Sequence, residues 1–551
     1  MQRDLRRLAD TNFDVVVVGA GIYGTTAAWD AALRGLSVAL IDRGDFGSGT
    51  SFNSAKTVHG GVRMLQSGNI SGLRQFVRER RALTRIAPHL IHPMPFVIPT
   101  YQSFLRHRWF MRIGFGLNDL LASDRNEGLD PANHLPHSQL LSRSECLRLN
   151  PFIDPNGVTG GIKWFDCQMH NSDRVNLSFI LSAEAKGAAV ANYVECTGAT
   201  RSNGRICGIT ARDCLKGEQF DIRARVVLNA AGPWAPSLLT ALVPDTKPAL
   251  PRGLSKAMNI ILAKPMTHRH AVGGSSNSRL LFLSPWRGFT LAGTSHSSFE
   301  SSPDMLDVTQ PEVEAFLQDI NKAFPGLRAE LPDIRLIHRG LLPSHEDNSS
   351  GLTLLKQSVV HDHRQDGSPG LVSLLGVRYT TARHTAQQAV DTVFSILDIA
   401  PPPCQTHSTP VVGGTLTDVR AFFEEATHNT LTTPDHITRG RLARTYGSTH
   451  TTLLNNIQTT PSDHELLSTH CNITHAEVRH AVNAEMAVHL PDVILRRTEA
   501  GSAGQPDDTA LRAAADIMAQ ELNWSAERIE SEITDTKSVY QIALKPRKRY
   551  R

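Results

Sequence analysis

The chain has 551 residues, of which 40% are hydrophobic and 20% are charged. At roughly 150 residues per domain this length predicts three or four domain-sized units, so a single small binding module, a disordered chain and a collagen-like fibre are excluded. Lysine and arginine outnumber aspartate and glutamate by only 57 to 53, a net charge of +4. That excess is too small to predict a nucleic acid as partner.

The location of the protein is constrained by segments that the sequence lacks. No apolar run approaches the roughly 18 residues that cross a bilayer, and the start, MQRDLRRLAD, has no apolar stretch of a secretory signal. The 7 cysteines are an odd number without a CxxC pair, which argues against a disulfide framework and a zinc site. We therefore predict a cytoplasmic protein with reduced thiols.

Both ends of the chain are basic. The first carries Arg3, Arg6 and Arg7, and the last reads ALKPRKRYR. Such ends can hold a protein against anionic lipid at about 1 kcal/mol per charge, although a solvated, frayed terminus has the same composition. Peripheral association with the inner face of the cell membrane therefore stays open.

The first motif lies in FDVVVVGAGIYGTTAAWDAALRGLSVALIDRGD. The apolar run Val15–Val18 predicts a buried parallel strand, and Gly19, Gly21 and Gly24 form G-x-G-x-x-G at the start of a predicted helix. A second strand then leads to Asp42, where a carboxylate can accept from ribose hydroxyls. Strand, glycines, helix, strand and acid in this order predict a dinucleotide site.

The following segments favour FAD over NAD. After Asp42 comes a long loop of glycine, serine and threonine, RGDFGSGTSFNSAKTVHGGVRMLQ, which suits the flavin end of a larger cofactor. A second strand, glycine and helix start follow in LVSLLGVRYTTARHTAQQAVD, with Thr380 and Thr381 as cap candidates. Between them, ARVVLNAAGPWAPSLL brings Gly232 close to the predicted cofactor.

These segments resemble a known family. TSFNSAKTVHGGVRMLQ, FDCQMHNSDRVN, LNAAGPWA, LSPWRGFTLAGTS, IHRGLLP and GVRYTTAR are similar, in this order, to motifs of the FAD-dependent glycerol-3-phosphate dehydrogenases, which belong to the D-amino-acid-oxidase-like flavoproteins. RTYGSTH and EVRHAVNAEMAVHLPDVILRRTEAG resemble the helical C-terminal domain of the same family. The resemblance covers nearly the whole chain.

The resemblance implies oxidation of the C2 hydroxyl of sn-glycerol 3-phosphate to dihydroxyacetone phosphate, with hydride to FAD and electrons onward to quinone. Such a site needs cations for the phosphate and a group that takes the hydroxyl proton. The implied catalytic residues are Arg63, Arg339, Arg378, His59 and Asn259. The implied cofactor-binding residues are Gly19, Gly21, Gly24, Asp42, Arg43, Thr50, Ser51, Lys56, His59, Gly232, Gly376, Thr380 and Thr381.

Four positions depart from the family pattern where it would contact substrate, namely Met64, Asn259, His296 and Arg378. Because Asn259 stands where a histidine is common, the proton acceptor would be His59, His338 or the flavin itself. A different phosphorylated or carboxylated hydroxy or amino compound is therefore an alternative substrate, because a fold does not determine its substrate. Oxygen as acceptor and a non-catalytic flavin-binding protein at a membrane surface are further alternatives.

The expected fold class is α/β. A Rossmann-like FAD-binding domain, assembled from about 1–85, 155–245 and 365–400, would enclose an inserted α+β substrate domain within residues 1–400. A Pro- and Gly-rich linker at about 400–414 would lead to a helical domain over 415–551. The oligomeric state, including a homodimer, stays open.

Two pairs of histidines have a spacing that can bind metal. They are His361 and His363, in HDHRQDG, and His268 and His270. Because neither pair has a cysteine or a second clustered pair nearby in sequence, we expect solvated loops and predict no metal site.

Overall fold

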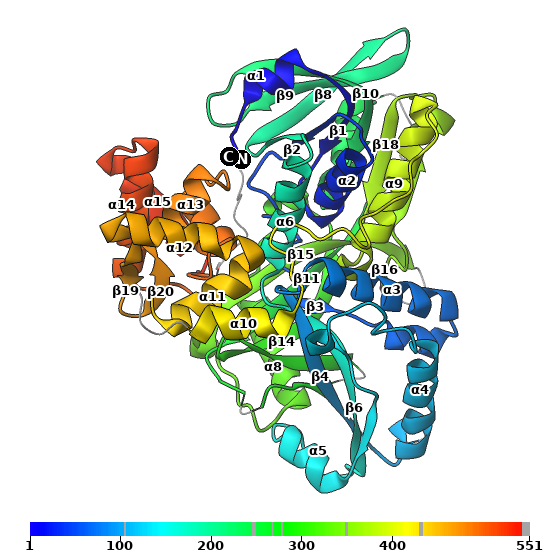
Figure 1. The fold of residues 1–551 in the computed structure, drawn as a ribbon. Helices are drawn as coiled ribbons and strands as arrows, with labels where there is room; N and C mark the ends of the chain where they lie inside the picture. The colour runs from blue at the N-terminus through cyan, green and yellow to red at the C-terminus, as the bar shows by residue number, and fades with distance from the viewer. Residues whose placement is uncertain are drawn as a thin grey trace.

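The computed structural model describes residues 1–103, 106–244, 250–266, 268–276, 279–347, 351–428 and 434–542. Figure 1 shows three regions: a sheet with helices at the top, a second sheet below it, and a group of helices to one side, drawn in yellow to red.

The first sheet is built from segments far apart in the chain. Its strands follow the order β17-β18-β10-β1-β2-β7, with β8 and β9 attached beside β10. From β18 to β7 neighbouring strands are parallel. The strands are β1 (Asn12–Val18), β2 (Val38–Ile41), β7 (Ala189–Ala191), β8 (Val194–Ser202), β9 (Arg205–Asp213), β10 (Gln219–Asn229), β17 (Val359–Asp362) and β18 (Leu371–Leu375). The helices on this sheet are α1 (Leu5–Asp10), α2 (Ile22–Leu33), α6 (Ser172–Glu184), α7 (Ala235–Leu242) and α9 (Ala382–Leu397).

The apolar run of β1 is buried on both faces of this sheet. Val15 and Val17 pack into a core shared with α2, α6 and α9, whereas Val16 and Val18 pack into a second core with α7 and β9. A strand with two buried faces needs a continuous apolar sequence, which is what the sequence predicted.

The second sheet has one face toward a core and one toward an open cavity. Along β11, Met258, Ile260 and Leu262 join the core with helix α8, while Ala257 and Asn259 line the cavity. This alternation is the two-residue period of a strand. The strands are β3 (Thr57–Val58), β4 (Ile91–Thr100), β5 (Gln139–Leu141), β6 (Gly160–Met169), β11 (Gly253–Leu262), β12 (Ala271–Ser276), β13 (Arg279–Trp286), β14 (Phe289–Phe299), β15 (Ile334–Asp347) and β16 (Gly351–Leu354). The helices of this region are α3 (Ile70–Ile86), α4 (Arg108–Leu121), α5 (Arg143–Leu149) and α8 (Gln310–Ala323).

The C-terminal region is mainly helical and has its own core. Helix α14 buries Leu511, Ala514 and Met518 in it, at the helical spacing of the sequence. The elements are α10 (Val419–His428), α11 (His436–Tyr446), α12 (His450–Thr459), α13 (His475–Asn483), α14 (Asp508–Leu522), α15 (Ala526–Ser538), the hairpin β19 (Leu466–Ser468) and β20 (Cys471–Thr474), and the π-helix η11 (Asp492–Arg497).

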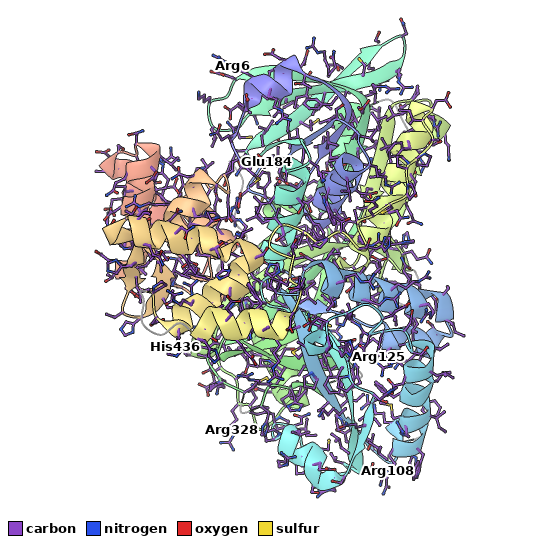
Figure 2. The ribbon with its side chains drawn as sticks, viewed as in Figure 1. Arg6, Arg108, Arg125, Glu184, Arg328 and His436 are labelled. Carbon is purple, nitrogen blue, oxygen red and sulfur yellow. The ribbon has the colours of Figure 1, made fainter. Side chains whose placement is uncertain are left out.

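The N-terminus is held by the rest of the protein. The Met1 amino group donates to Ala484 O at 2.8 Å, and Arg3 forms an ion pair with Asp213 at 2.6 Å. Of the two interpretations left open for this end, the frayed terminus is therefore wrong, and Arg3 is engaged within the protein. Figure 2 shows Arg6 and Arg108, the first residue of α4, at opposite ends of the molecule. The basic residues from 545 onward lie outside the described residues.

The segment HDHRQDG is part of the first sheet. His361 lies in the edge strand β17, and His363 begins a 3-10 turn, η7 (His363–Asp366). His363 is only 1% exposed. The prediction of a solvated loop was wrong here, because pairing of β17 with β18 carries this segment onto the sheet.

Candidate functional site

The glycine turn after β1 can be formed only by glycine. Gly19 has φ +106°, and a Cβ there would lie 2.6 Å from the Ala230 carbonyl oxygen. A Cβ on Gly24 would lie 1.8 Å from the Gly19 carbonyl oxygen, so this glycine allows strand and helix to pack closely. Helix α2 begins at the cap residue Gly21, which has no side chain to satisfy the first amides. Ile22 N donates to Ser51 Oγ at 2.9 Å, and a phosphate group placed there would receive the remaining N–H donors of the first turn.

Asp42 lies at the end of the neighbouring strand β2. Its carboxylate accepts from Ala20 N at 2.7 Å and from Gly44 N at 2.9 Å, which fixes its orientation. Burial raises its pKa to about 6. A hydroxyl-bearing ligand that donates to this carboxylate would stabilise its charged form.

One large cavity starts at these groups and extends to the second sheet. Its volume is about 2310 Å³. That exceeds the roughly 300–1,000 Å³ of an ordinary small-molecule pocket and leaves room for an extended cofactor together with a second molecule. The cavity lies beyond the carboxyl ends of the parallel strands, where ligands bind in open α/β sheets.

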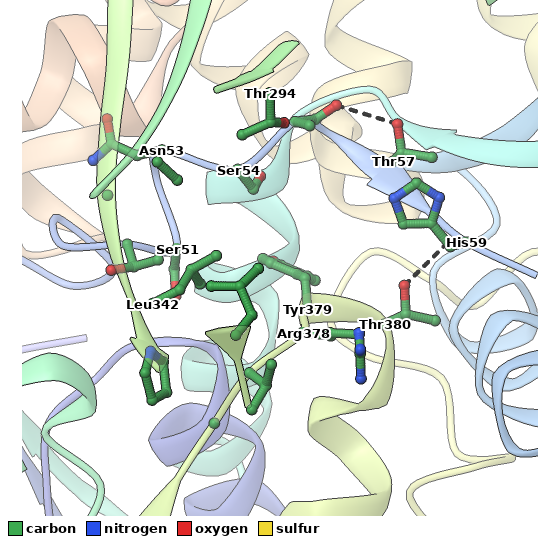
Figure 3. A pocket seen from close by; sticks show the side chains of 18 of the residues that line it. Ser51, Asn53, Ser54, Thr57, His59, Thr294, Leu342, Arg378, Tyr379 and Thr380 are labelled. Carbon is green, nitrogen blue, oxygen red and sulfur yellow. Dashed lines mark hydrogen bonds between the residues drawn. The ribbon is translucent and has the colours of Figure 1, made fainter. Parts of the chain in front are cut away.

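Most of the predicted cofactor residues line this cavity, and Figure 3 shows several of them around it. The lining ones are Gly19, Gly21, Asp42, Arg43, Thr50, Ser51, His59, Gly232, Gly376 and Thr380. Gly24 acts in packing, as described. Thr381 lies outside the lining, 7% exposed, and its hydroxyl donates to Arg378 O at 3.4 Å.

Lys56 is not in contact with the cavity, which corrects the prediction for this residue. It is 1% exposed, and its ammonium group donates to Phe52 O at 2.5 Å and Ser172 Oγ at 2.8 Å. Burial lowers its pKa to about 8. Lys56 therefore stabilises the flavin loop by joining it to helix α6, on the side away from the cavity.

The predicted role of Arg339 as a catalytic residue in the cavity is also corrected. Its side chain is 6% exposed and lies outside the cavity lining, with Nη1 3.3 Å from Asp307 and Nη2 donating to Val539 O at 3.3 Å. Three residues later, Leu342 contributes an apolar side chain to the cavity (Figure 3). With its guanidinium group engaged by Asp307 and outside the lining, Arg339 does not contribute a cation to the cavity in this structure.

Other cations do line the cavity. Arg63 and Arg378 come from the flavin loop and from the segment after β18, and Arg279 from the start of β13. Among the described residues no carboxylate lies within ion-pair distance of Arg63 or Arg378, and Arg279 is 4.0 Å from Asp319. The sequence missed Arg279, since no motif marks it.

His296 lines the same cavity as Arg63 and Arg279. Its pKa is lowered by burial and, beyond that, by the positive charges of Arg279 and Arg63. Strand β14 carries His296 to the cavity. Three cationic or donor groups at one end of a cavity form a site for an anion such as a phosphate.

His59 lies in the same cavity and has a buried partner. Its backbone N–H donates to Thr380 Oγ1 at 3.0 Å (Figure 3), and its Nδ1 lies 3.8 Å from Asp166 Oδ2. Asp166 is 4% exposed and is held by Arg80 and by Gly60 N. Asp166 was not predicted, because only the pairing of β3 with β6 brings it beside His59.

Two further residues considered from the sequence, Asn259 and His338, do not suit the role of proton acceptor. Asn259 lines the cavity, but it is held by Thr294 Oγ1, which donates to it at 2.7 Å, and an amide has no titratable group. His338 is 0% exposed, lies outside the cavity lining, and neither of its ring nitrogens has a hydrogen-bond partner. His59 is therefore the candidate base.

Known proteins match the chain along nearly its whole length. Residues 14–387 match the model of a family described as FAD dependent oxidoreductase, and residues 404–529 match the C-terminal domain of alpha-glycerophosphate oxidase. A glycerol-3-phosphate dehydrogenase of Synechocystis is 29% identical over 96% of this chain and 97% of its own. The mitochondrial enzyme of Mesocricetus auratus is 30% identical over 96% of this chain and 73% of its own.

The chain belongs to the FAD dependent oxidoreductase family. Within it, the chain groups with the glycerol-3-phosphate dehydrogenases, as the sequence predicted. FAD is its cofactor, and the glycine turn, the α2 N-terminus and Asp42 provide the contacts that its diphosphate and ribose require.

Solved structures show the same fold. A glycerol-3-phosphate dehydrogenase of Bacillus halodurans complexed with FAD has a TM-score of 0.77 at 24% identity, covering 99% of this chain and 98% of its own. The L-alpha-glycerophosphate oxidase of Mycoplasma pneumoniae with FAD bound has a TM-score of 0.54 at 15% identity and covers 73% of this chain and 99% of its own.

Proposed function

We propose that the protein oxidises sn-glycerol 3-phosphate at C2 to dihydroxyacetone phosphate. The observation that supports this best is the anion site of Arg63, Arg279 and His296 in the same cavity as His59 and its partner Asp166. A phosphorylated alcohol needs both features, a cationic site for the phosphate and a base for the hydroxyl. The names of the related dehydrogenases agree with this substrate.

The cations hold and orient the substrate. Guanidinium groups of Arg63 and Arg279 can bind phosphate oxygens two at a time, and Arg378 adds positive charge near the loop after β18. Fixing the phosphate positions the C2 carbon, and correct positioning of reacting groups lowers the barrier to the reaction.

Oxidation at C2 removes a hydride and a proton. FAD, when bound, accepts the hydride. His59 accepts the hydroxyl proton, and the negative charge of Asp166 stabilises the imidazolium that results. Aromatic residues, Phe96, Trp164 and Phe282, form an apolar wall of the cavity and exclude water from it.

Anaerobic reduction of the bound flavin tests the proposal. Mixing the holoprotein with sn-glycerol 3-phosphate should bleach the oxidised flavin absorbance and yield dihydroxyacetone phosphate, whereas glycerol 2-phosphate should leave the spectrum unchanged. His59→Gln should keep its flavin but be reduced roughly 10²–10⁴-fold more slowly, the usual effect of removing a general base. A flavin that stays oxidised with sn-glycerol 3-phosphate would reject this substrate.

A different phosphorylated alcohol is the second candidate. The displacement of Arg339 from the cavity and the presence of Leu342 in it make one region of the predicted phosphate site apolar. A panel of phosphorylated alcohols in the same bleaching assay distinguishes the two candidates, because the anion site serves both.

We further propose that electrons pass to a quinone at a membrane surface. Helix α4 exposes large apolar side chains on one face: Trp109 is 59%, Ile113 71% and Leu120 70% exposed. Arg108 and Arg112 lie among them, a composition typical of helices that lie in the interface of an anionic bilayer. Other residues of α4, Phe110, Met111 and Phe115, line the cavity, so an apolar acceptor could enter along the helix.

This surface replaces the basic N-terminus as the membrane contact, since Arg6 lies at the opposite end of the molecule from α4 (Figure 2). None of the helices in the described part of the chain is long and apolar enough to span a bilayer. All seven cysteines are free, which supports a reducing compartment and hence the cytoplasmic face.

Vesicle binding tests the membrane proposal. Trp109→Glu together with Leu120→Glu, at two exposed positions of α4 outside the cavity lining, should abolish flotation with vesicles that contain phosphatidylglycerol and slow reduction of a membrane-bound quinone, while reduction of a water-soluble dye stays unchanged. Leu215→Glu, at an exposed leucine in the β9–β10 turn, is the control. Equal flotation of both variants would reject α4 as the contact.

We also propose the division into a discontinuous FAD-binding domain (about 1–85, 155–245 and 365–400), an inserted substrate domain, and a C-terminal domain over 415–551. The first sheet supports this division, because its strands come from the first two of these segments and from residues 359–375.

A further inference from the structure

Three potential metal ligands meet at the edge of the first sheet. His361 lies in β17, and His363 and Asp366 begin and end the turn η7. His361 Nε2 and His363 Nδ1 lie 2.6 and 2.8 Å from the same oxygen, Asp366 Oδ2. The donor atoms of all three side chains lie within 4.8 Å of one another.

The local backbone explains why these groups converge. Asp362 accepts from Arg364 N at 3.0 Å and so caps the turn, while Gly367, at φ +74°, ends it in a conformation that favours glycine. The only cation within the turn, Arg364, donates to Asp362 at 2.8 Å and to Ser395 at 3.1 Å. Its charge is therefore engaged by groups outside the cluster.

His363 is the fixed member of the cluster. It is 1% exposed, and its second ring nitrogen, Nε2, lies 2.9 Å from Ser373 Oγ on the paired strand β18. A histidine that binds metal commonly uses its other ring nitrogen for such a fixed hydrogen bond. His361 and Asp366, by contrast, are 23% and 27% exposed, so an ion can enter from solvent.

The three donor atoms, two imidazole nitrogens and one carboxylate oxygen, are of the types that a divalent ion binds. Donors around a tetrahedral ion are about 3.3 Å apart, so the two exposed ligands would need to move outward by less than about 1 Å.

We propose that His361, His363 and Asp366 bind a divalent transition-metal ion such as Zn²⁺, with water completing its coordination. Two imidazoles and one carboxylate match the ligands that this ion prefers. The ion would tie the edge strand β17 and its turn together and so stabilise the border of the FAD-binding sheet.

The chain contains a matched control. His268 and His270 have the same spacing, but their rings are 6.2 Å apart and His268 Nε2 contacts Arg148 O at 3.1 Å. Among the described residues, no carboxylate joins them in a three-residue group.

Metal titration of the flavoprotein tests the site. Holoprotein stripped with a chelator and then equilibrated with Zn²⁺ should retain one ion per flavin by elemental analysis. His361→Gln and Asp366→Asn should bind the ion at least tenfold more weakly, and His268→Gln should bind it as the original chain does. Unchanged flavin content and an unchanged unfolding midpoint without metal would show that the variants are folded.

Two measurements make the outcome decisive. Zn²⁺ should raise the thermal unfolding midpoint of the original protein and of His268→Gln, but not of His361→Gln, since only a ligand bound to the folded state stabilises it. The proposal is overturned if the original protein retains no ion. It is equally overturned if His361→Gln and Asp366→Asn retain as much ion as His268→Gln.

Discussion

Two groups of buried or half-buried arginines lie on different sides of the flavin loop, residues 43–63, and differ in their partners. Two that line the cavity, Arg63 and Arg378, have no carboxylate within ion-pair distance among the described residues, whereas a third, Arg43, pairs with Asp304. Those between the loop and the C-terminal region are all ion-paired: Arg497 and Arg496 with Asp45 at 2.6 and 2.5 Å, and Arg174 with Glu485 at 2.5 Å.

This difference in partners distinguishes arginines that can bind a ligand from arginines that stabilise the fold. A buried arginine with a carboxylate partner has its charge neutralised within the protein, whereas one without a partner is available to an anionic ligand. Arg339 belongs to the first kind, since it pairs with Asp307, although its motif suggested the second. The paired group also shows that the C-terminal region holds the flavin loop in place, since Asp45 lies in that loop.

The largest expected effect concerns a paired arginine. Arg497→Met should lower the free energy of unfolding by about 3–5 kcal/mol, because it leaves the buried Asp45 carboxylate short of a partner. Urea denaturation measures it. Arg512→Met breaks an exposed pair with Glu530 in the same region and should cost far less, because solvent screens exposed charges. Equal losses in the two variants would contradict the structural role of the buried pair.

The paired group should also determine the response to acid. Burial alone would raise the pKa of Glu485, but the charges of Arg174 and His480 outweigh it and lower the pKa from 4.5 to about 2. A carboxylate whose pKa is lowered on folding stabilises the folded state at pH values above its pKa in the unfolded chain. This stabilisation is lost as the pH falls from about 4.5 toward 2.

Unfolding free energies measured across this range should therefore fall by about 3 kcal/mol through Glu485. Glu485→Gln, which cannot titrate, should be less stable at pH 7 and should show a flatter dependence. A parallel fall in both proteins would assign the acid sensitivity to other carboxylates.

The unpaired group should affect substrate binding instead. Arg63→Gln should raise KM roughly 10- to 100-fold, the value of charge-assisted hydrogen bonds to phosphate, while flavin content and unfolding stay unchanged. Arg339→Gln should do the reverse, lowering stability through its lost contact with Asp307 and leaving KM as it was. Steady-state kinetics and urea denaturation on both variants decide between this assignment and the one made from the motif.

Asp166 combines the two features, since it pairs with the buried Arg80 and lies beside His59 at the cavity, and it should give the smallest effect. Asp166→Asn should lower kcat about tenfold with KM unchanged, because His59 loses the charge that stabilises its protonated form. The holoprotein should keep its flavin. A rise in KM without a change in kcat would place Asp166 in support of the substrate site rather than beside the base.

Much of this architecture follows from local sequence patterns. Gly19 and Gly24 are predictable because backbone contacts exclude any Cβ there, and Val15–Val18 because a strand buried on both faces must be apolar. The chain order of the motifs was enough to predict the family and FAD. Each of these features leaves a mark on consecutive residues of the sequence, even where, as for Gly19 and Ala230, the contact that requires it comes from a distant segment.

The roles of individual charges required the tertiary structure. Nothing in IHRGLLP shows that Arg339 meets Asp307, and nothing near His59 shows Asp166, about a hundred residues away in the chain. The same holds for Arg279 beside Arg63 and for Asp366 beside His361 and His363. Sequence by itself determined the fold class, the cofactor and the glycine turn, because each depends on local conformation. Only the packing of distant strands decided which cations face the cavity, because a charge is available to a ligand only where no carboxylate has been brought against it.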